Sequence, residues 1–504
     1  MKAKALQICG TGSGVGKSVI VSALCRIFLQ DGYKVCPFKA QNMALNSFVT
    51  AEAGEIGRAQ AVQALACRID PTVDMNPVLI KPVTDIGAQV IVRGKPIGNM
   101  NALNYTRYKR KLLPVVKKSF DRLSKGYEVI VIEGAGSPAE INLKSHDIVN
   151  MKMAQYAKAP VILVGDIDKG GVFASFVGTL ELLTKRERAM VKGFVINKFR
   201  GDISLLKPGI DWLEKRTGIR VLGTIPYFRN IIIPEEDAVP LDNFTKRGIP
   251  GKRQKLKIDV IYLPHISNFT DFDPLAAEPD VELRYVDSLE GLNDPDIIII
   301  PGTKSTSSDL SYLKKTGFEG KILSAANSRK PAVILGICGG YQILGEMIYD
   351  RHSIESACKK IKGLGLLPVS TRLMPQKELS RVKARDLFSG REVSGYEIHH
   401  GLTKIGKGCK PLFEVFLRNG RKIKYFDGIT CNNGRILGTY IHGLFDAAVF
   451  RRDFLNRVRL KKGWATLSQA AAFDPDMEID KLAKLVRENI DTGYLYKILT
   501  RSRG

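Results

Sequence analysis

Residues 4–18, KALQICGTGSGVGKS, decide the fold of the first half of the chain. The apolar run 4–9 predicts a buried strand, and residues 17–30 predict a helix directly after the glycine-rich turn. Glycine lets successive backbone N–H groups turn inward, toward the point that the positive end of the helix also faces. Lys17 is placed to reach the β- and γ-phosphates of a nucleoside triphosphate, and Ser18 to ligate Mg²⁺. The residues of this turn predicted to bind the nucleotide are Gly12, Ser13, Gly14, Val15, Gly16, Lys17 and Ser18.

The loop is a variant of the usual phosphate cradle, because Thr11 stands where the common spacing has glycine. Further apolar runs follow the loop at residues 35–38, 128–133, 160–164 and 191–196. Helical stretches lie between these runs. This alternation predicts a mostly parallel, doubly wound sheet. Ligands of such sheets bind beyond the carboxyl ends of the strands, so polar residues at those ends belong to the predicted site.

Three polar residues extend this site. Glu133 ends the run 128–133 and is the expected second contact to Mg²⁺; the alternative is an acid that faces solvent. Glu55, like the neighbouring Glu52, could complete the metal shell or be an acid on a helix surface. Asn197 follows the run 191–196, where its amide could read the purine edge. The expected cofactors are ATP and Mg²⁺, with no tightly bound organic cofactor.

The periodic pattern stops at RGIPGK, residues 247–252, which indicates a linker. A second α/β series follows, with apolar runs at 258–263, 297–300 and 332–337. The expected division of the chain is 1–250 for the P-loop domain, 256–460 for a second α/β domain and 461–504 for a C-terminal helical extension.

A cysteine in the second series has the sequence context of a nucleophile. In LGICGGYQ, residues 335–342, Cys338 ends an apolar strand and two glycines follow. Such a strand-to-helix turn exposes the side chain, and the helix N-terminus favours the thiolate. His442, in GTYIHG at residues 438–443, is the expected base. The N–H of Gly339 and a donor from the Gly302 region are the expected oxyanion hole.

The other histidines and cysteines carry weaker signals. His265, His399 and His400 line a pocket or support the structure, and the sequence favours neither. No pair of candidate ligands repeats at the spacing of a zinc site. The chain has eight cysteines without a CxxC pair, which predicts free thiols in a reducing compartment.

Composition narrows the class of protein. The 504 residues are 44% hydrophobic and carry a formal net charge of +26. The basic residues are spread along the chain without a DNA-binding motif, so we expect acidic small-molecule substrates and no nucleic-acid partner. No apolar run is long enough for a membrane span, and the N-terminus lacks a secretory pattern. We therefore expect a cytoplasmic protein with no membrane partner, and the sequence predicts no particular oligomeric state.

The motifs resemble known families. Residues 335–342 and 438–443 resemble the class I glutamine amidotransferase domain, and Leu444 stands where most of that class has an acid, as in the cobyrinic-acid branch. The first half is similar to the dethiobiotin-synthetase-like ATPases, which activate carboxylates. Ordered phrases over nearly the whole chain resemble the cobyric acid synthase family: KAQNM (39–43), GEIGRAQ (54–60), DMNPVL (74–79), DIDKGGVFAS (166–175) and ISNFTD (266–271).

This resemblance implies an α/β fold, with a P-loop doubly wound sheet followed by a flavodoxin-like amidotransferase domain. It implies ATP- and glutamine-dependent amidation of adenosylcobyrinic acid a,c-diamide at its b, d, e and g carboxylates. Glutamine, ATP and this corrinoid are the expected small-molecule partners. The residues expected to contact the substrate are Gln41, Asn42, Asn46 and Lys81.

Three alternatives stay open at this point. The chain could amidate another carboxylate substrate, such as cobyrinic acid itself. It could be a partitioning-type ATPase that binds DNA, although those proteins carry a lysine early in the loop, where this chain has Gly12. It could also be a regulator with an inactive amidotransferase domain, which the presence of both Cys338 and His442 disfavours.

Overall fold

The computed structural model describes residues 3–84, 87–228, 230–233, 254–328, 330–356, 358–468 and 473–500. The chain forms two compact units, which are described separately. The first unit comprises Met1–Ala44, Glu55–Pro234 and Asp474–Gly504. The second comprises Leu45–Gly54 and Glu235–Phe473.

This division differs from the three ranges expected from the sequence. The expected boundary near residue 250 and the linker 247–252 lie outside the described residues. Residues 474–504 belong to the first unit and are not a separate extension. The short segment 45–54 belongs to the second unit, although the sequence places it inside the first half.

The first unit is built on a six-stranded sheet with the strand order β12-β11-β10-β1-β9-β2, parallel throughout. Its strands are β1 (Lys4–Gly10), β2 (Val35–Phe38), β9 (Val129–Glu133), β10 (Val161–Asp166), β11 (Val191–Phe199) and β12 (Val221–Pro226). The apolar runs read from the sequence therefore correspond to strands of one sheet.

Helices cover both faces of this sheet. Along β9, Val129 and Val131 belong to the apolar cluster on one face, while Ile130 and Ile132 belong to the cluster on the other. Because successive strand residues point to opposite faces, a continuous apolar run is what a sheet covered on both sides requires. The helices and turns between strands are α1 (Lys17–Gln30), α2 (Arg58–Ala66), α3 (Ala102–Gly126), η1 (Lys144–His146), α4 (Met151–Ala157), α5 (Val172–Leu182), α6 (Lys185–Arg188) and α7 (Ile203–Thr217).

The first unit also contains a smaller four-stranded sheet with the order β3-β6-β7-β8. Its strands are β3 (Gln41–Met43), β6 (Val78–Thr84), β7 (Gly87–Val92) and β8 (Lys95–Asn101), and the short strand β5 (Glu55–Gly57) precedes α2. This sheet was not predicted from the sequence, in which β3 is only three residues long and β8 is mostly exposed.

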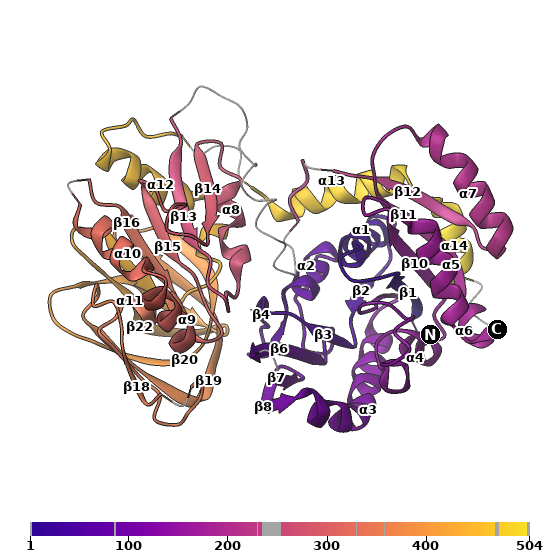
Figure 1. The fold of residues 1–504 in the computed structure, drawn as a ribbon, viewed down its shortest axis with the longest axis horizontal. Coiled ribbons are helices and arrows are strands. Elements are labelled where there is room, and N and C mark those ends of the chain that lie inside the picture. The colour runs from indigo at the N-terminus through magenta and orange to yellow at the C-terminus, as the bar shows by residue number, and fades with distance from the viewer. Residues whose placement is uncertain are drawn as a thin grey trace. The chain divides into compact units, whose positions relative to one another are not determined.

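The C-terminal helices α13 (Pro475–Glu488) and α14 (Thr492–Thr500) complete the first unit, and α13 lies along α1 (Figure 1). Their apolar residues, including Leu482 and Leu495, share one core with α1. Arg26 on α1 is fully buried and donates to Asp480 at 2.6 Å and to Asp476. A buried guanidinium that depends on these two carboxylates ties the C-terminal residues to the first unit.

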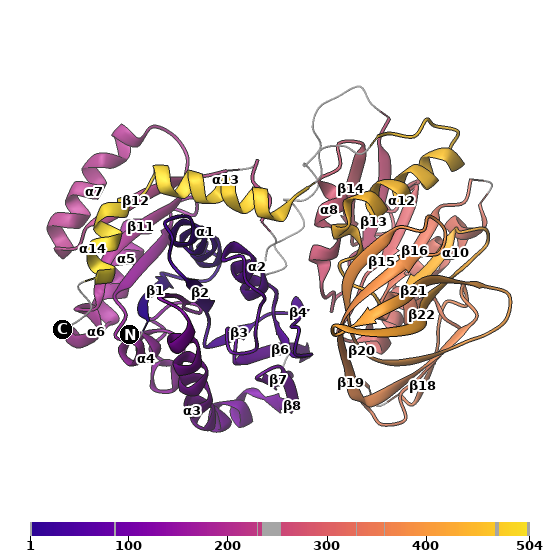
Figure 2. The same ribbon diagram turned by 180° about the vertical axis from the view of Figure 1, so that it is seen from behind.

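The second unit contains an eleven-stranded mixed sheet. Its parallel part has the order β14-β13-β15-β16-β23 and includes the predicted apolar runs. Long antiparallel strands continue the sheet (Figure 2). The strands are β13 (Leu256–Ile261), β14 (Val281–Val286), β15 (Ile297–Ile300), β16 (Val333–Ile337), β17 (Met347–Tyr349), β18 (Lys360–Lys362), β19 (Val369–Asp386), β20 (Glu392–Ile405), β21 (Lys410–Arg418), β22 (Arg421–Cys431) and β23 (Ile436–Thr439).

Helices and turns surround this sheet, and their apolar residues join one large core with β13 to β16. They are η3 (Phe269–Phe272), α8 (Asp273–Ala276), α9 (Thr306–Lys315), α10 (Phe318–Asn327), α11 (Gly339–Leu344), η4 (Leu444–Asp446) and α12 (Ala448–Lys461). The segment 45–54 contributes the short strand β4 (Ser47–Val49). Both units are α/β, as the sequence predicted. In the described part of the chain, no helix is both long enough and apolar enough to span a membrane.

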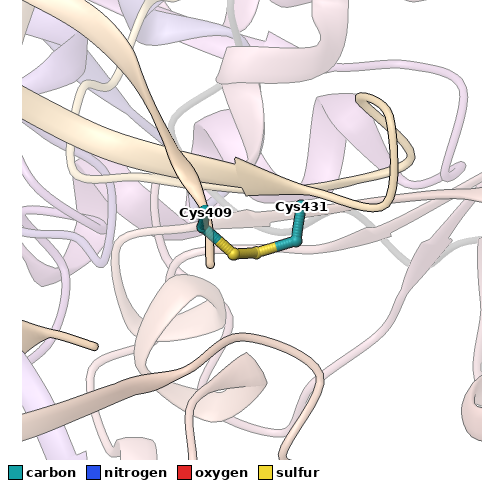
Figure 3. Close-up of a disulfide and its surroundings, with 2 residues drawn as sticks. All are labelled: Cys409 and Cys431. Atoms are coloured by element: carbon teal, nitrogen blue, oxygen red, sulfur yellow. A yellow bond between two sulfur atoms is a disulfide. The ribbon is translucent and has the colours of Figure 1, made fainter. Parts of the chain in front are cut away.

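Cys409 and Cys431 form a disulfide between the start of β21 and the end of β22 (Figure 3). The expectation that all cysteines are free thiols was wrong for this pair, because the hairpin register brings Lys410 opposite Thr430 and so places the flanking cysteines together. Cys9, Cys25, Cys36 and Cys67 are free and buried, as predicted, and Cys358 is free and exposed.

Removing this disulfide will destabilise the second unit. It closes a loop with a sequence separation of 22. In the chain-entropy model, opening a loop of this size costs roughly 3 kcal/mol. We expect Cys409→Ser to lower the free energy of unfolding of the second unit by about that amount, measured by denaturant titration. Cys358→Ser is the control, since it removes an exposed free thiol. Equal unfolding curves for Cys409→Ser and the unaltered protein would contradict the prediction.

Candidate active sites

The cysteine of the second unit sits on a strained strand-to-helix turn. Cys338 follows β16, precedes α11 and has φ 53° and ψ −106°, a conformation rarely adopted by a residue with a side chain. The turn also needs glycine at 340, because a Cβ there would lie 1.9 Å from the carbonyl oxygen of Ile300. The predicted nucleophile turn is therefore present. The predicted exposure is wrong, because neighbouring elements leave only 7% of Cys338 accessible.

His442 lies beside this sulfur, and a buried acid orients it. Nδ1 of His442 is 2.6 Å from Oδ2 of Asp271, and Oδ1 of the same carboxylate accepts from the N–H of Gly443 at 3.1 Å. Both side chains are almost fully buried. The Sγ of Cys338 donates to the carbonyl oxygen of Ile398 at 3.6 Å. Cys338, His442 and Asp271 thus have the arrangement of a nucleophile, a base and an orienting acid.

The charge of Asp271 keeps His442 protonated. Burial alone lowers the pKa of His442, but the charge and hydrogen bond of Asp271, with a further contribution from Cys338, raise the pKa to about 10. An imidazolium beside a sulfur stabilises its thiolate, which is the nucleophilic form. His442 therefore carries positive charge beside the sulfur at neutral pH.

Sequence reasoning missed Asp271. The usual place of the acid, two residues after the histidine, is occupied by Leu444, so nothing near His442 pointed to a partner. Asp271 lies 171 residues earlier, in the turn η3 that follows β13. Its membership of the phrase ISNFTD was the one available signal.

The expected oxyanion residues lie next to this triad. A Cβ at Gly302 would meet Cε1 of His442 at 3.0 Å, and a Cβ at Gly339 would meet the side chain of Thr303 at 2.6 Å. The loop after β15 and the start of α11 therefore approach each other at the sulfur. Of the undecided histidines, His399 stacks on Tyr440 with ring centroids 3.8 Å apart, and burial lowers its pKa to about 3. His265 pairs with Asp309 at 2.7 Å.

The glycine-rich loop of the first unit runs from β1 to α1, as predicted. Nζ of Lys17 lies in the loop itself, donating to the carbonyl oxygens of Gly12 at 2.8 Å and Gly136 at 3.1 Å. Gly14 and Gly16 have φ of 68° and 95°, which glycine adopts without strain. The loop thus has the turned backbone that a phosphate cradle needs.

Glu133 meets Ser18 at the end of β9. Its carboxylate accepts from Oγ of Ser18 at 2.9 Å, from Nζ of Lys39 at 2.8 Å and from Gln63. Burial alone raises the pKa of Glu133, but the charge of Lys39 and these hydrogen bonds outweigh it and hold the pKa below its usual value. Glu133 is therefore a carboxylate, and with Ser18 it presents the hard oxygen donors that Mg²⁺ takes beside a triphosphate. Lys39, which follows β2, is a cation of this site that sequence reasoning did not single out.

Two more residues touch the loop from the end of β11. Nδ2 of Asn197 donates to the carbonyl oxygen of Val15 at 2.9 Å, so this amide supports the loop backbone. Lys198 donates to the carbonyl oxygen of Gly14 and to Asp166, both at 2.8 Å. Asn197 is therefore beside the predicted nucleotide, and its contact with a purine stays a prediction.

Family models match both units. Residues 6–241 match the CobQ/CobB/MinD/ParA nucleotide binding domain, and residues 257–450 match the CobB/CobQ-like glutamine amidotransferase domain. The cobyric acid synthase of Dehalococcoides mccartyi (strain CBDB1) is 51% identical over 505 residues, covering 99% of each chain. That of Clostridium botulinum (strain Loch Maree / Type A3) is 48% identical, covering 98% of this chain and 99% of the relative. The chain belongs to the cobyric acid synthase family.

Membership of this family makes the chain an enzyme that uses a nucleotide-binding domain and a glutamine amidotransferase domain to form C–N bonds. The partitioning ATPase and the inactive regulator are thereby set aside. A solved structure, of PurLQS from Thermotoga maritima, is similar over 46% of this chain and 100% of its own, at 16% identity and a TM-score of 0.29. So weak a similarity adds nothing to the family assignment.

The expected substrate residues of this family member fall into two groups. Gln41 and Asn42 on β3 and Lys81 on β6 belong to the small sheet of the first unit, where Gln41 pairs with Val78. Oε1 of Gln41 accepts from Tyr105 at 2.5 Å, and Asn42 donates to Gln60 at 2.9 Å. Asn46 belongs to the second unit instead, and its side chain bonds to the backbone there.

Glu55 is paired with a lysine of the small sheet. Its carboxylate forms a buried ion pair with Lys81, 2.9 Å from Nζ. Among the residues that the structure describes, no group of three or more histidine, cysteine or acidic side chains is arranged to hold a metal by itself. A Mg²⁺ site formed by Ser18 and Glu133 does not require three such side chains, since Mg²⁺ commonly completes its shell with phosphate and water.

Proposed function

We propose that the chain catalyses ATP- and glutamine-dependent amidation of adenosylcobyrinic acid a,c-diamide at its b, d, e and g carboxylates. The observation that carries this proposal is full-length similarity to cobyric acid synthases, on a chain that holds both a Cys338–His442–Asp271 triad and a phosphate loop. These are the two sites that the reaction needs, one to release ammonia and one to activate a carboxylate.

The triad accounts for the release of ammonia. The thiolate of Cys338 attacks the side-chain carbonyl of glutamine, and His442 gives its proton to the departing nitrogen. The N–H groups near Gly339 and Gly302 stabilise the oxyanion. Water then hydrolyses the thioester and glutamate leaves. Asp271 holds the imidazole in the required orientation throughout.

The phosphate loop accounts for activation. Lys17 and Lys39 bring positive charge to the γ-phosphate as it is transferred to a substrate carboxylate. Ammonia attacks the resulting acyl phosphate, forming the amide and releasing phosphate. Ser18 and Glu133 would hold Mg²⁺, which neutralises phosphate charge when bound. The formal net charge of +26 favours the approach of polyanionic substrates through electrostatic steering.

Glu133→Gln will impair amidation and spare glutamine hydrolysis. The substitution keeps the shape but removes the charge that Ser18 and Lys39 face. We expect amide formation to fall roughly 100-fold or more with glutamine or ammonium as the nitrogen source, and the Mg²⁺ requirement to rise. Glutamate release should stay within about threefold. Glu128→Gln, directly before the same strand, is the control, because the Glu128 carboxylate is exposed and accepts from the N–H of Lys34. Full amidation by Glu133→Gln would overturn this role.

Substrate identity is tested by competition. The purified chain is incubated with glutamine, Mg-ATP and an equal mixture of cobyrinic acid and its a,c-diamide, and the mass of each corrinoid is followed. We expect amide-for-acid replacement in the a,c-diamide until the b, d, e and g positions are converted. Preferential conversion of cobyrinic acid would favour the alternative substrate.

A further inference from the structure

The segment Leu45–Gly54 belongs to the unit that contains the triad, although it lies in sequence between β3 and β5 of the first unit. It carries β4 and has no catalytic group of its own. Its side chains nevertheless contact residues on two sides of the triad, which gives the segment a role that the sequence did not suggest.

The first set of contacts reaches the turn of Asp271. Oδ1 of Asn46 accepts from the N–H of Phe269 at 3.2 Å, within η3. Asn268, directly before η3, has φ 55° and exchanges two hydrogen bonds with the backbone of Ser47, at 3.4 and 3.2 Å. These side chains are buried. The segment thus fixes the backbone that presents Asp271 to His442.

The second set reaches the ring that covers His442. Tyr396 stacks on His442 with centroids 5.4 Å apart and an interplanar angle of 15°, and the two residues exchange backbone hydrogen bonds at 3.2 and 2.9 Å. The hydroxyl of Tyr396 accepts from Asn268 at 2.8 Å. The ring of Phe48 packs against the ring of Tyr396, with centroids 5.0 Å apart. The segment therefore also holds Tyr396, whose ring stacks on the imidazole of His442.

A third contact lies next to the nucleophile. Val49 is fully buried in a small apolar cluster with Tyr396 and Ile398, and Phe48 packs against that cluster. The carbonyl oxygen of Ile398 is the acceptor for Sγ of Cys338. One short segment is thus in contact with the immediate neighbours of all three triad residues.

We propose that Leu45–Gly54 is a positioning segment of the glutamine site, in which Asn46 and Phe48 hold the Asp271 turn and Tyr396 and thereby set His442 against Cys338. This inference rests on the proposed role of the triad in glutamine hydrolysis. Neither residue touches glutamine or the reacting atoms in this account. The expected contact of Asn46 with the corrinoid stays a prediction, and the role inferred here concerns the glutamine half-reaction.

Glutamate release by the full chain tests the proposal without the corrinoid. For Asn46→Ala and Phe48→Ala we expect kcat for glutamine hydrolysis to fall about 10- to 100-fold with KM changed less than about threefold, since small displacements of catalytic groups cost this much. Alkylation of Cys338 by iodoacetamide, corrected with Cys338→Ala for the exposed Cys358, should slow in parallel. Phe48→Tyr keeps the ring and should restore most of kcat.

Asn456→Ala is the matched control, because the Asn456 side chain also bonds to backbone in the same unit. Its Nδ2 donates to the carbonyl oxygen of Leu467, and its Oδ1 accepts from the N–H of Leu467. It should lose stability similarly and keep kcat. Unchanged kcat in both Asn46→Ala and Phe48→Ala would overturn the proposal, as would an equal loss in Asn456→Ala. A wild-type chain that releases glutamate but leaves the corrinoid unaltered would count against the proposed substrate and leave this test intact.

Discussion

Cys338→Ala is expected to abolish amidation with glutamine and to retain amidation with ammonium. The sulfur is the only atom of the site able to form the thioester, so glutamate release should fall roughly a thousandfold or more. Supplied ammonia bypasses this half-reaction, because the proposed mechanism activates the carboxylate at the phosphate loop of the first unit. The measurement is corrinoid mass with either nitrogen source.

Cys358→Ala is the control for this substitution, since Cys358 is a free exposed thiol in the same unit. It should behave as the unaltered protein with both nitrogen sources. Loss of the ammonium reaction in a folded Cys338→Ala protein would contradict the division of labour between the two units. Retained glutamine use would remove Cys338 from the mechanism.

Asp271→Asn is expected to give the second largest loss. An amide cannot stabilise the imidazolium and favours a different tautomer of His442, and an equivalent change in a serine-protease triad lowers kcat about 10⁴-fold. We expect a fall of roughly 10²- to 10⁴-fold in glutamate release, with the ammonium reaction retained. Asp273→Asn, two residues further along at the start of α8, removes a nearby buried carboxylate and serves as the control for local disturbance.

The same substitution should shift the pH profile. Asp271 raises the pKa of His442 to about 10, so the active imidazolium persists until pH rises through that value. Asp271→Asn removes the negative charge that favours the imidazolium, so burial lowers the pKa of His442. The alkaline limb of the glutamate-release profile should therefore move to lower pH. Tyr396, Cys338 and His399 are further titratable side chains near His442, and His399 is already neutral at these pH values. An unmoved alkaline limb in Asp271→Asn would contradict this account of His442.

Local signals in the sequence predicted much of this enzyme. The helix 17–30 and the strands 35–38 and 297–300 match the structure at both ends, because buried runs and a glycine loop leave few alternatives. Cys338 and His442 were predicted from glycine contexts that the structure brings together. These features depend on neighbours in sequence, which is why sequence reasoning reached them.

The features that were missed depend on long-range contacts. Asp271 reaches His442 across 171 residues, and the disulfide partner of Cys409 is fixed by a hairpin register. The C-terminal helix α13 packs on α1 through Arg26, and its amphipathic pattern alone did not name that partner. The segment 45–54 changes units without any break in composition. In each case the deciding contact appears only after the strands have been placed.

The most direct test of the central claim uses glutamine isotopically labelled at its amide nitrogen. The purified chain is given this glutamine, Mg-ATP and the a,c-diamide corrinoid, with unlabelled ammonium in the medium, and the corrinoid product is analysed by mass. If the Cys338 site supplies ammonia to the ATP-dependent site, the amides formed at the b, d, e and g positions carry the label. Glutamate release with a corrinoid of unchanged mass would contradict the account.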